Sequence, residues 1–467
     1  MNTTSIRSVA YACAAMALLC MASDPALASH RRARTSTAVY TQTNGLDGNQ
    51  VVAFRQRNDG TLDHIGDFDT GGLGSTEFDG GEGLDPLISA DALVVTDNQR
   101  FLLTVNAGSD SITSFRINSD FTLTRVSTVP SGGVGPNSLA TRGRLVFVTN
   151  IDRDGFALGD PDVARGEPND EGNVVGFRIS RRGRLRRIEG SVANLDNRPA
   201  DVGFSRNGRH LIVSSITAGS AQLPGPDAEN SVSVFGVRRN GKLTGLRGAA
   251  IGTPVGNREE RNLASAIDFD VTTIRGREFV VVTEAREFNS RGAPPALPAL
   301  QAGSVSVYEL LGNGFLIPTA MDVAIGDPEA SPFEEASQLT TCWIDFGRDG
   351  RTFFVSNAIN ATISSFYLRR DGIPVLLEEV AAAGVSGFEN GGTTGPEVFG
   401  TTDGFIDLDV SDDGRYLYQL QGLSGAISVY RVRGAKLDLV DEVTGYLPEI
   451  DTQGIISVTR RSGRYYR

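Results

Sequence analysis

The chain has 467 residues, a formal net charge of −12 at pH 7, 55 glycines and 7% aromatic residues. This acidic balance disfavours nucleic acid and anionic membrane as partners, and it favours cations or neutral ligands. Abundant glycine, few aromatic residues and the lack of a long amphipathic helical pattern favour many short strands joined by tight turns.

Residues 1–28 have the pattern of a signal peptide. Arg7 precedes the apolar run VAYACAAMALLCMA, and Pro25-Ala26-Leu27-Ala28 is an A-x-A-like cleavage signal. The run is too short to span a bilayer comfortably. Leu19 also stands before Cys20, where a lipoprotein signal requires a small residue. We therefore expect a secreted or periplasmic protein without a membrane span, which begins with a basic tail over residues 29–37.

One pattern then recurs along the chain: an apolar strand with a polar end, a second strand, a turn and a third strand. A further short strand and a turn of the form x-D/N-G-R precede most copies. The seven copies begin with AVYTQTNG at Ala38, LLTVN at Leu102, VFVTN at Val146, LIVSS at Leu211, VVVTE at Val280, FFVSN at Phe353 and YLYQLQ at Tyr416. Each unit therefore has four antiparallel strands, and the preceding short strand is counted as the first. Seven such units predict an all-β fold, the seven-bladed β-propeller.

The first copy lacks a preceding strand, and the end of the chain supplies one. TQGIISV, at Thr452–Val458, follows the seventh copy when that copy is already complete. We expect this strand to become the innermost strand of blade one and to close the ring, which removes an open sheet edge. The propeller then spans residues 38–458, and residues 459–467 form a basic tail.

The longest connections collect on one face of the predicted disc. The crossings from second to third strand are long in blades three, four and five, at residues 151–172, 216–229 and 285–302. Strand direction places them on the same rim as several long blade-to-blade connections. Insertions gathered on one face are typical of a binding face, and neutral drift of surface loops is the alternative.

Alignment of the copies predicts a ring of polar residues at that face. The ends of the second strands contribute Asn44, Asn106, Asn150, Ser215, Glu284, Asn357 and Gln421, and the starts of the first strands contribute Asp201, Trp343 and Asp407. From these, the candidate ligand-binding residues are Asn106, Asn150, Asp201, Trp343, Asn357, Asp407 and Gln421. The alternative for each Asn is a hydrogen bond to the backbone of its own turn.

Glu284 brings a carboxylate where the other blades have amides or a hydroxyl, and Arg286 lies two residues further on. The pair is the candidate catalytic pair, with a structural salt bridge as the alternative. Asp152 and Asp154, in the acidic loop of blade three, are candidate ligands for Ca²⁺ or another divalent cation. Their spacing does not continue as an EF-hand, so a solvated acidic loop is the alternative. None of the three histidines is placed for general-base work at this face.

The repeated pattern VxVxN…xSVSxFxV…xDGxL, joined through xDGRxLxV, resembles the lactonase-like propeller family of 6-phosphogluconolactonase and carboxymuconate cycloisomerase type. The resemblance covers residues 38–458 and implies a lactonase-like fold. Enzymatic members carry Pro-Arg-His or Pro-His motifs at inner-strand starts and a Glu after a second-strand Asn. Here the matching positions read Pro199-Ala200-Asp201 and Pro136-Asn137-Ser138, and Ile216 replaces the Glu. The family's catalytic residues are therefore not carried over.

Two hypotheses follow. The chain is an exported lactonase-like propeller that binds a small molecule and hydrolyses a lactone, with Glu284 as base and Arg286 as electrostatic stabiliser. Alternatively, it is a non-catalytic propeller that binds a protein, a glycan or a divalent cation. We expect a monomer that requires no cofactor, binds no nucleic acid and does not span a membrane.

Overall fold

The computed structural model describes residues 35–75, 85–87, 89–151, 172–195, 198–216, 231–246, 251–252, 265–285, 302–326, 338–384 and 403–461. By its contacts the chain divides into two units, one of Ser36–Arg460 and one of Met1–Thr35 with Arg461–Arg467. The first unit is the propeller. The expected signal peptide and most of the acidic loop of blade three lie outside the described residues.

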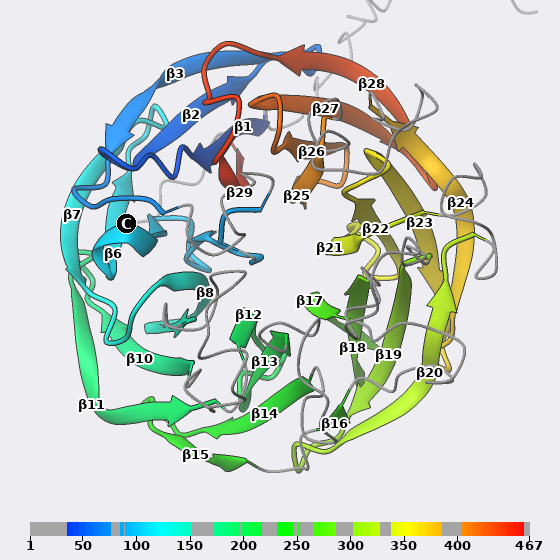
Figure 1. Ribbon diagram of the computed structural model, residues 1–467, viewed down its shortest axis with the longest axis horizontal. Coiled ribbons are helices and arrows are strands. Elements are labelled where there is room, and N and C mark those ends of the chain that lie inside the picture. The colour runs from blue at the N-terminus through cyan, green and yellow to red at the C-terminus, as the bar shows by residue number, and fades with distance from the viewer. Residues whose placement is uncertain are drawn as a thin grey trace, which may run out of the picture. The chain divides into compact units, whose positions relative to one another are not determined.

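The propeller consists of seven antiparallel sheets arranged around a central axis (Figure 1), and we call the region that the innermost strands enclose the channel. From this region outward, blade 1 comprises β29 (Gln453–Arg461), β1 (Thr35–Gln42), β2 (Gln50–Gln56) and β3 (Leu62–Asp69). Blade 2 comprises β4 (Leu93–Val95), β5 (Phe101–Asn106), β6 (Ser111–Ile117) and β7 (Leu123–Pro130), with the short 3₁₀ helix η1 (Ala107–Ser109) after β5. Blade 3 comprises β8 (Pro136–Arg142), β9 (Leu145–Asn150), β10 (Asn173–Ile179) and β11 (Leu185–Asn194).

The remaining blades repeat this order. Blade 4 comprises β12 (Arg198–Phe204), β13 (His210–Ile216), β14 (Ser231–Val237) and an outer strand in two pieces, β15 (Leu243–Leu246) and β16 (Ile251–Gly252). Blade 5 comprises β17 (Ser265–Ile274), β18 (Arg277–Ala285), β19 (Ser304–Leu310) and β20 (Leu316–Ala324). Blade 6 comprises β21 (Thr341–Phe346), β22 (Thr352–Asn357), β23 (Thr362–Leu368) and β24 (Pro374–Ala383). Blade 7 comprises β25 (Phe405–Val410), β26 (Tyr416–Gln421), β27 (Ala426–Arg433) and β28 (Lys436–Val443). The predicted seven-bladed propeller is confirmed.

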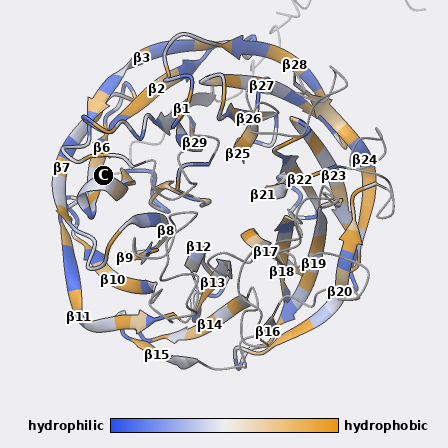
Figure 2. Cartoon of the chain, viewed as in Figure 1, coloured by the Kyte–Doolittle hydropathy of each residue, from blue (hydrophilic) through white to orange (hydrophobic). Residues whose placement is uncertain are grey.

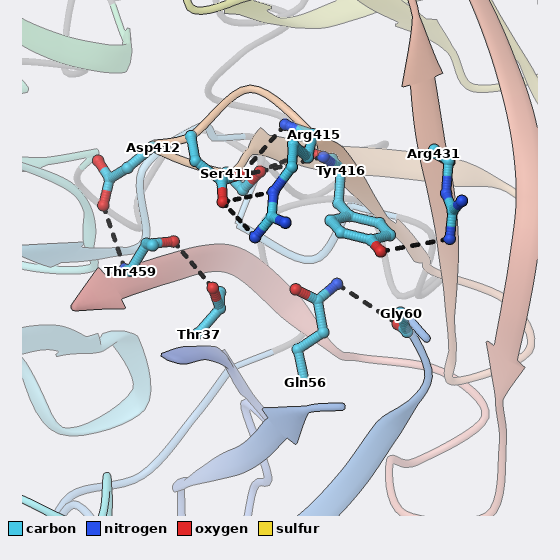
Figure 3. A network of polar contacts seen from close by, with 10 residues as sticks. Thr37, Gln56, Gly60, Ser411, Asp412, Arg415, Tyr416, Arg431 and Thr459 are labelled. Carbon is cyan, nitrogen blue, oxygen red and sulfur yellow. Dashed lines mark hydrogen bonds and ion pairs between the residues drawn. The ribbon is translucent and has the colours of Figure 1, made fainter. Parts of the chain in front are cut away.

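The ring closes as the sequence predicted, with the C-terminal strand inside blade 1. In Figure 1 the red β29 lies beside the blue β1. Thr41 Oγ1 donates to the Gly454 carbonyl at 2.6 Å, and the hydroxyls of Thr37 and Thr459 lie 3.0 Å apart. Figure 3 shows the latter contact, together with the Thr459 amide, which donates to Asp412 of blade 7 at 3.1 Å. The two ends of the propeller therefore share one sheet, and that sheet is fastened to blade 7.

Hydrophobic side chains fill the space between neighbouring blades. The described residues form seven buried clusters. The cluster between blades 2 and 3, for example, joins Leu103 and Val105 to Val146 and Val148. The outermost strands carry hydrophilic stretches (Figure 2). The apolar second and third strands thus explain why blades pack face to face, and the polar ring of the outer strands faces water.

In two blades, a glycine in a turn packs closely against an aromatic ring of the preceding blade. Gly183 has φ +86, and a Cβ there would lie 2.5 Å from the Phe101 ring of the preceding blade. Ser114 Oγ of that blade donates to the Gly183 carbonyl at 2.7 Å. Gly372 repeats the arrangement, with φ +85 and a Cβ position 2.5 Å from the Phe279 ring. Only glycine combines this backbone conformation with so close an approach.

We predict that Gly183→Ala lowers the free energy of unfolding by about 3 kcal/mol, because backbone strain and a clash with Phe101 act together. Gly434→Ala is the matched control, since Gly434 has φ +69 but no heavy atom within 4 Å of the Cβ position. That variant should lose only about 1 kcal/mol from the backbone conformation. Urea unfolding of both variants measures the difference, and equal losses would show that the contact with Phe101 has no energetic role.

Candidate functional site

Aspartates on the inner strands form a ring around the channel. They occur at alternating positions, and alternate residues of a strand point to the same side. The ring consists of Asp91, just before β4, Asp201 on β12, Asp268 and Asp270 on β17, Asp345 on β21, and Asp407 and Asp409 on β25. Asp201, Asp268 and Asp407 are at most 6% exposed. Asp91, Asp270, Asp345 and Asp409 are half-buried.

The ring carboxylates accept hydrogen bonds from the inner strand of the next blade. Asp268 Oδ2 accepts from the Ile344 amide at 2.8 Å, and Asp407 Oδ2 accepts from the Ile455 amide at 3.1 Å. Each inner strand is the edge of its sheet, so the amides that point away from that sheet have no strand partner. The aspartates satisfy these amides and so link consecutive blades.

Further contacts of the same kind complete the ring. Asp345 Oδ2 accepts from the Val410 amide at 2.6 Å, and Asp409 Oδ2 accepts from the Ser457 amide at 3.1 Å. In blade 3 a hydroxyl replaces the carboxylate, and Ser138 Oγ accepts from the Val202 amide at 3.2 Å. The ring therefore has a structural role at most blade junctions.

Asp201 and Asp268 differ from this pattern because their two carboxyl groups interact with each other. Ser138 Oγ also donates to Asp201 Oδ1 at 2.8 Å. Burial raises the pKa of Asp201 to about 7, although the hydrogen bonds it accepts oppose that rise. Burial, reinforced by the charge of Asp201, raises the pKa of Asp268 well above its usual range. Buried carboxyl groups with raised pKa values are groups of the kind that general acid–base chemistry uses near neutral pH.

The pKa values of other carboxyl groups in the ring are raised as well. Burial raises the pKa of Asp407 to about 8 and that of Asp409 to about 7. Burial also raises the pKa of Asp91 well above its usual range, and the charge of Asp201 adds to the effect. The ring can therefore gain and lose protons within the physiological pH range.

The segment before β4 lies over one end of the channel. The Ser89 carbonyl accepts from Trp343 Nε1 of blade 6 at 3.0 Å and from Gln453 Nε2 of blade 1 at 3.1 Å. The Ala90 amide donates to the Ala200 carbonyl of blade 4 at 3.3 Å. A connection between blades 1 and 2 thus touches three blades across the channel. Trp343 is 1% exposed and belongs to the hydrophobic cluster at the centre.

Four of the polar residues predicted at the second-strand ends are buried and bound to the neighbouring third strand. The Asn106 amide donates to Ser111 Oγ at 3.1 Å and Thr113 Oγ1 at 3.0 Å. Asn357 repeats the contact with Thr362 Oγ1 at 3.0 Å and Ser364 Oγ at 2.8 Å, and the Gln421 amide donates to Ser428 Oγ at 2.7 Å. The Asn150 amide donates to Asn173 Oδ1 at 2.9 Å. These contacts hold the second and third strands together at the predicted mouth, and ligand binding by these residues stays a prediction.

Glu284 occupies the corresponding position in blade 5. It is fully buried, and its two carboxylate oxygens accept from Ser304 Oγ at 2.6 Å and from Ser306 Oγ at 2.7 Å. Its side chain therefore makes the contacts that Asn106 and Asn357 make in their blades. Its catalytic role stays a prediction. Its proposed partner Arg286, and the candidate metal ligands Asp152 and Asp154, lie outside the described residues.

Within the described ranges, no group of three or more His, Cys, Asp or Glu side chains could hold a metal ion. The same part of the chain contains no helix with the length and apolar character needed to cross a membrane.

Alignment of the copies identified Asp201 and Asp407 but missed Asp268 and the other ring members. The signal was present as the alternations Asp268-Phe269-Asp270 and Asp407-Leu408-Asp409, in which carboxylates stand in otherwise apolar inner strands. A carboxylate in a buried strand requires a partner, and here the partner is the next blade.

The family model described as lactonase, 7-bladed β-propeller, matches residues 43–175, which run from blade 1 into blade 3. This part of the chain is similar to the lactonase family, and the whole ring is a seven-bladed β-propeller. No curated protein matches its sequence.

Solved structures resemble this propeller over most of its length. A protein from Bacteroides fragilis assigned as a 6-phosphogluconolactonase has 14% identity and a TM-score of 0.55, over 91% of this chain and 98% of that one. A similarly assigned protein from Bacteroides uniformis has 14% identity and a TM-score of 0.54, over 91% and 99%. A hypothetical selenium-binding protein from Sulfolobus tokodaii has 11% identity and a TM-score of 0.55, over 92% and 95%. At these identities the likeness is one of fold.

Proposed function

We propose that this lactonase-like propeller binds a small lactone at the channel end where Asp201 and Asp268 meet, and that it hydrolyses the lactone there. The observation that carries the proposal is that two buried, interacting carboxyl groups lie together, with Ser138 Oγ donating to Asp201 Oδ1 at 2.8 Å. Lactone hydrolysis needs a base for the attacking water and an acid for the departing ring oxygen. Two carboxyl groups, one ionised and one protonated, supply both.

In the proposed reaction, the ionised Asp201 carboxylate removes a proton from water as the water oxygen attacks the lactone carbonyl carbon. The carbon–oxygen bond of the ring then breaks, and the Asp268 carboxyl donates its proton to the departing oxygen. The product is a hydroxy acid. Ser138, which donates to Asp201 Oδ1, orients the base. The segment Ser89–Asp91 lies over this channel end, so the substrate displaces it or passes beside it.

We predict that Asp201→Asn lowers kcat/KM by about 100-fold or more, the usual contribution of a positioned acid or base. The assay uses a panel of neutral and acidic lactones with the mature protein. Asp268→Asn should show a comparable loss. Retained activity in both variants, with loss in Glu284→Gln, would assign the chemistry to Glu284 instead. Melting temperatures of the variants separate loss of chemistry from loss of fold.

A non-catalytic binding propeller is the second candidate. The observation that favours it is that Asn106, Asn357 and Glu284 are buried and hydrogen-bonded inside the fold. A thermal-shift scan with lactones, glycans and Ca²⁺ separates the two candidates, because a bound ligand raises the melting temperature through mass action. A shift with a glycan or Ca²⁺ and no turnover of any lactone would favour binding alone.

The proposal places the mature protein outside the cytoplasm, in the periplasm or secreted, because residues 1–28 have the pattern of a signal peptide. It also takes the mature protein to be a monomer that needs no bound cofactor. Mass spectrometry of the exported protein tests the first point through its N-terminus, which should follow Ala28.

A further inference from the structure

Cationic side chains gather on blades 3 and 4, although the chain as a whole carries a net charge of −12. Their side chains are exposed and lie in four turns, those joining β8 to β9, β10 to β11, β12 to β13 and β14 to β15. We name the set the arginine face, and it consists of Arg142, Arg144, Arg181, Arg182, Arg184, Arg206, Arg209, Arg238, Arg239 and Lys242.

These four turns form one continuous surface. In a four-stranded antiparallel sheet, the turn after the first strand and the turn after the third lie at the same end. Contacts join the turns of the two blades. Arg142 Nη2 donates to the Arg206 carbonyl at 2.6 Å, and Arg178 Nη2 donates to the Asn240 carbonyl at 3.1 Å. The arginine face therefore covers the end of both blades at which the turns after the first and third strands lie.

The charges of the arginine face are largely uncompensated. Among the described residues, the ion pair of the face is that of Arg206 with Asp270, at 3.5 Å. Turn arginines of other blades are paired locally, as are Arg369 with Asp371 at 2.8 Å and Arg415 with Asp413 at 2.6 Å. The turns of blades 3 and 4 thus keep a positive charge, whereas Arg369 and Arg415 each lie beside a carboxylate of their own turn.

Three features define the partner. First, nine of the ten cations are arginines, whose planar donor groups bind carboxylate, sulfate or phosphate through paired hydrogen bonds. Second, the same end of blades 1 and 7 carries Asp59 and Asp412, which would repel a flat anionic surface laid on the disc. Third, the large exposed hydrophobic residues of the described chain lie elsewhere, so the face has no aromatic platform for the bases of a single-stranded nucleic acid.

We propose that the arginine face binds a linear anionic polysaccharide with sulfate or carboxylate groups, which lies across blades 3 and 4. A narrow chain follows the cationic turns and avoids the acidic ones. This site is separate from the channel, so the inference does not depend on lactone hydrolysis.

The experiment measures fluorescence anisotropy of labelled heparin and polygalacturonate oligosaccharides with the mature protein. We expect saturable binding of at least one of them that weakens as salt rises, because ion pairing with a polyanion is screened. The variant Arg181→Gln/Arg182→Gln/Arg184→Gln should bind at least about 10-fold more weakly, because it removes three of the ten charges at the site. Should it fail to fold, Arg238→Gln/Arg239→Gln tests the same face.

The matched control is Arg369→Gln/Arg370→Gln, in the turn of blade 6 that is equivalent to residues 180–183. This control should keep full affinity. Equal loss in the control, or no binding of either oligosaccharide, overturns the proposal. Tighter binding of duplex DNA, or of vesicles that contain phosphatidylglycerol, overturns the choice of partner.

Discussion

A chain that ends at Ile450 should fail to form a stable propeller, because it lacks β29. Blade 1 would keep three strands, and its inner edge would face the channel without a partner. The deletion removes Val458, which is fully buried, and Ile455, which is 4% exposed. It also removes the amides that Asp407 and Asp409 bind.

The expected loss approaches the whole stability of the fold. Loss of two buried aliphatic side chains lowers the free energy of unfolding by about 2 kcal/mol each. The two carboxylates that lose their hydrogen-bond donors add about 2 kcal/mol each. Such a sum compares with the roughly 5–15 kcal/mol that stabilises a typical domain. Circular dichroism during heating measures the result. A chain that lacks only residues 462–467 is the control, and it should melt as the full chain does. A cooperative transition at an unchanged temperature in the shorter chain would contradict the closure of the ring by β29.

Stability should fall as pH rises from about 5 to 9, and Asp407→Asn should flatten this dependence. The folded pKa of Asp407 is about 8, raised from 3.8 by burial. A raised carboxyl pKa means that the folded state binds the proton more tightly than the unfolded state does. The stability from this proton is fully present below the unfolded pKa, and it is lost as pH rises through about 8.

Asparagine keeps an oxygen for the Ile455 amide and cannot ionise. We therefore expect Asp407→Asn to stabilise the protein at pH 9 by about 3 kcal/mol, roughly half of the full linkage value, because neighbouring carboxyl groups share the charge. The gain should be much smaller at pH 5 and vanish below the unfolded pKa of 3.8. Asp59→Asn is the control, since a hydrogen bond from Thr61 lowers the pKa of this exposed carboxyl and no gain is expected at pH 9. Urea unfolding at both pH values gives the comparison, and a gain of equal size at pH 5 would show that charge is not the cause.

The fold could be predicted because its information is local and repeated. Each copy contains its own strands and its own turn, such as Arg369-Arg370-Asp371-Gly372 between β23 and β24. The spare strand at Thr452–Val458 was equally visible once the first copy was found to be short. Closure of the ring then followed by counting strands.

The site was less predictable because its contacts cross between blades. Asp268 and the Ile344 amide are 76 residues apart, and the aspartate differs from its equivalent in blade 6, Trp343. Trp343 itself was expected to face a ligand. It contacts Ser89, 254 residues away, in the connection between blades 1 and 2. Alignment of repeats does not reveal contacts between such distant positions.

The closed first blade also has a consequence for how quickly the protein folds. Thr41 and Gly454 are hydrogen-bonded across a separation of 413 residues. Contacts between such distant positions carry a large loop-closure entropy, and chains that depend on them fold slowly. Blades 2 to 7 can form from local contacts as an open arc while the chain is still incomplete. The last step must wait for the final strand, so the time to reach the native state should be governed by the meeting of the two ends.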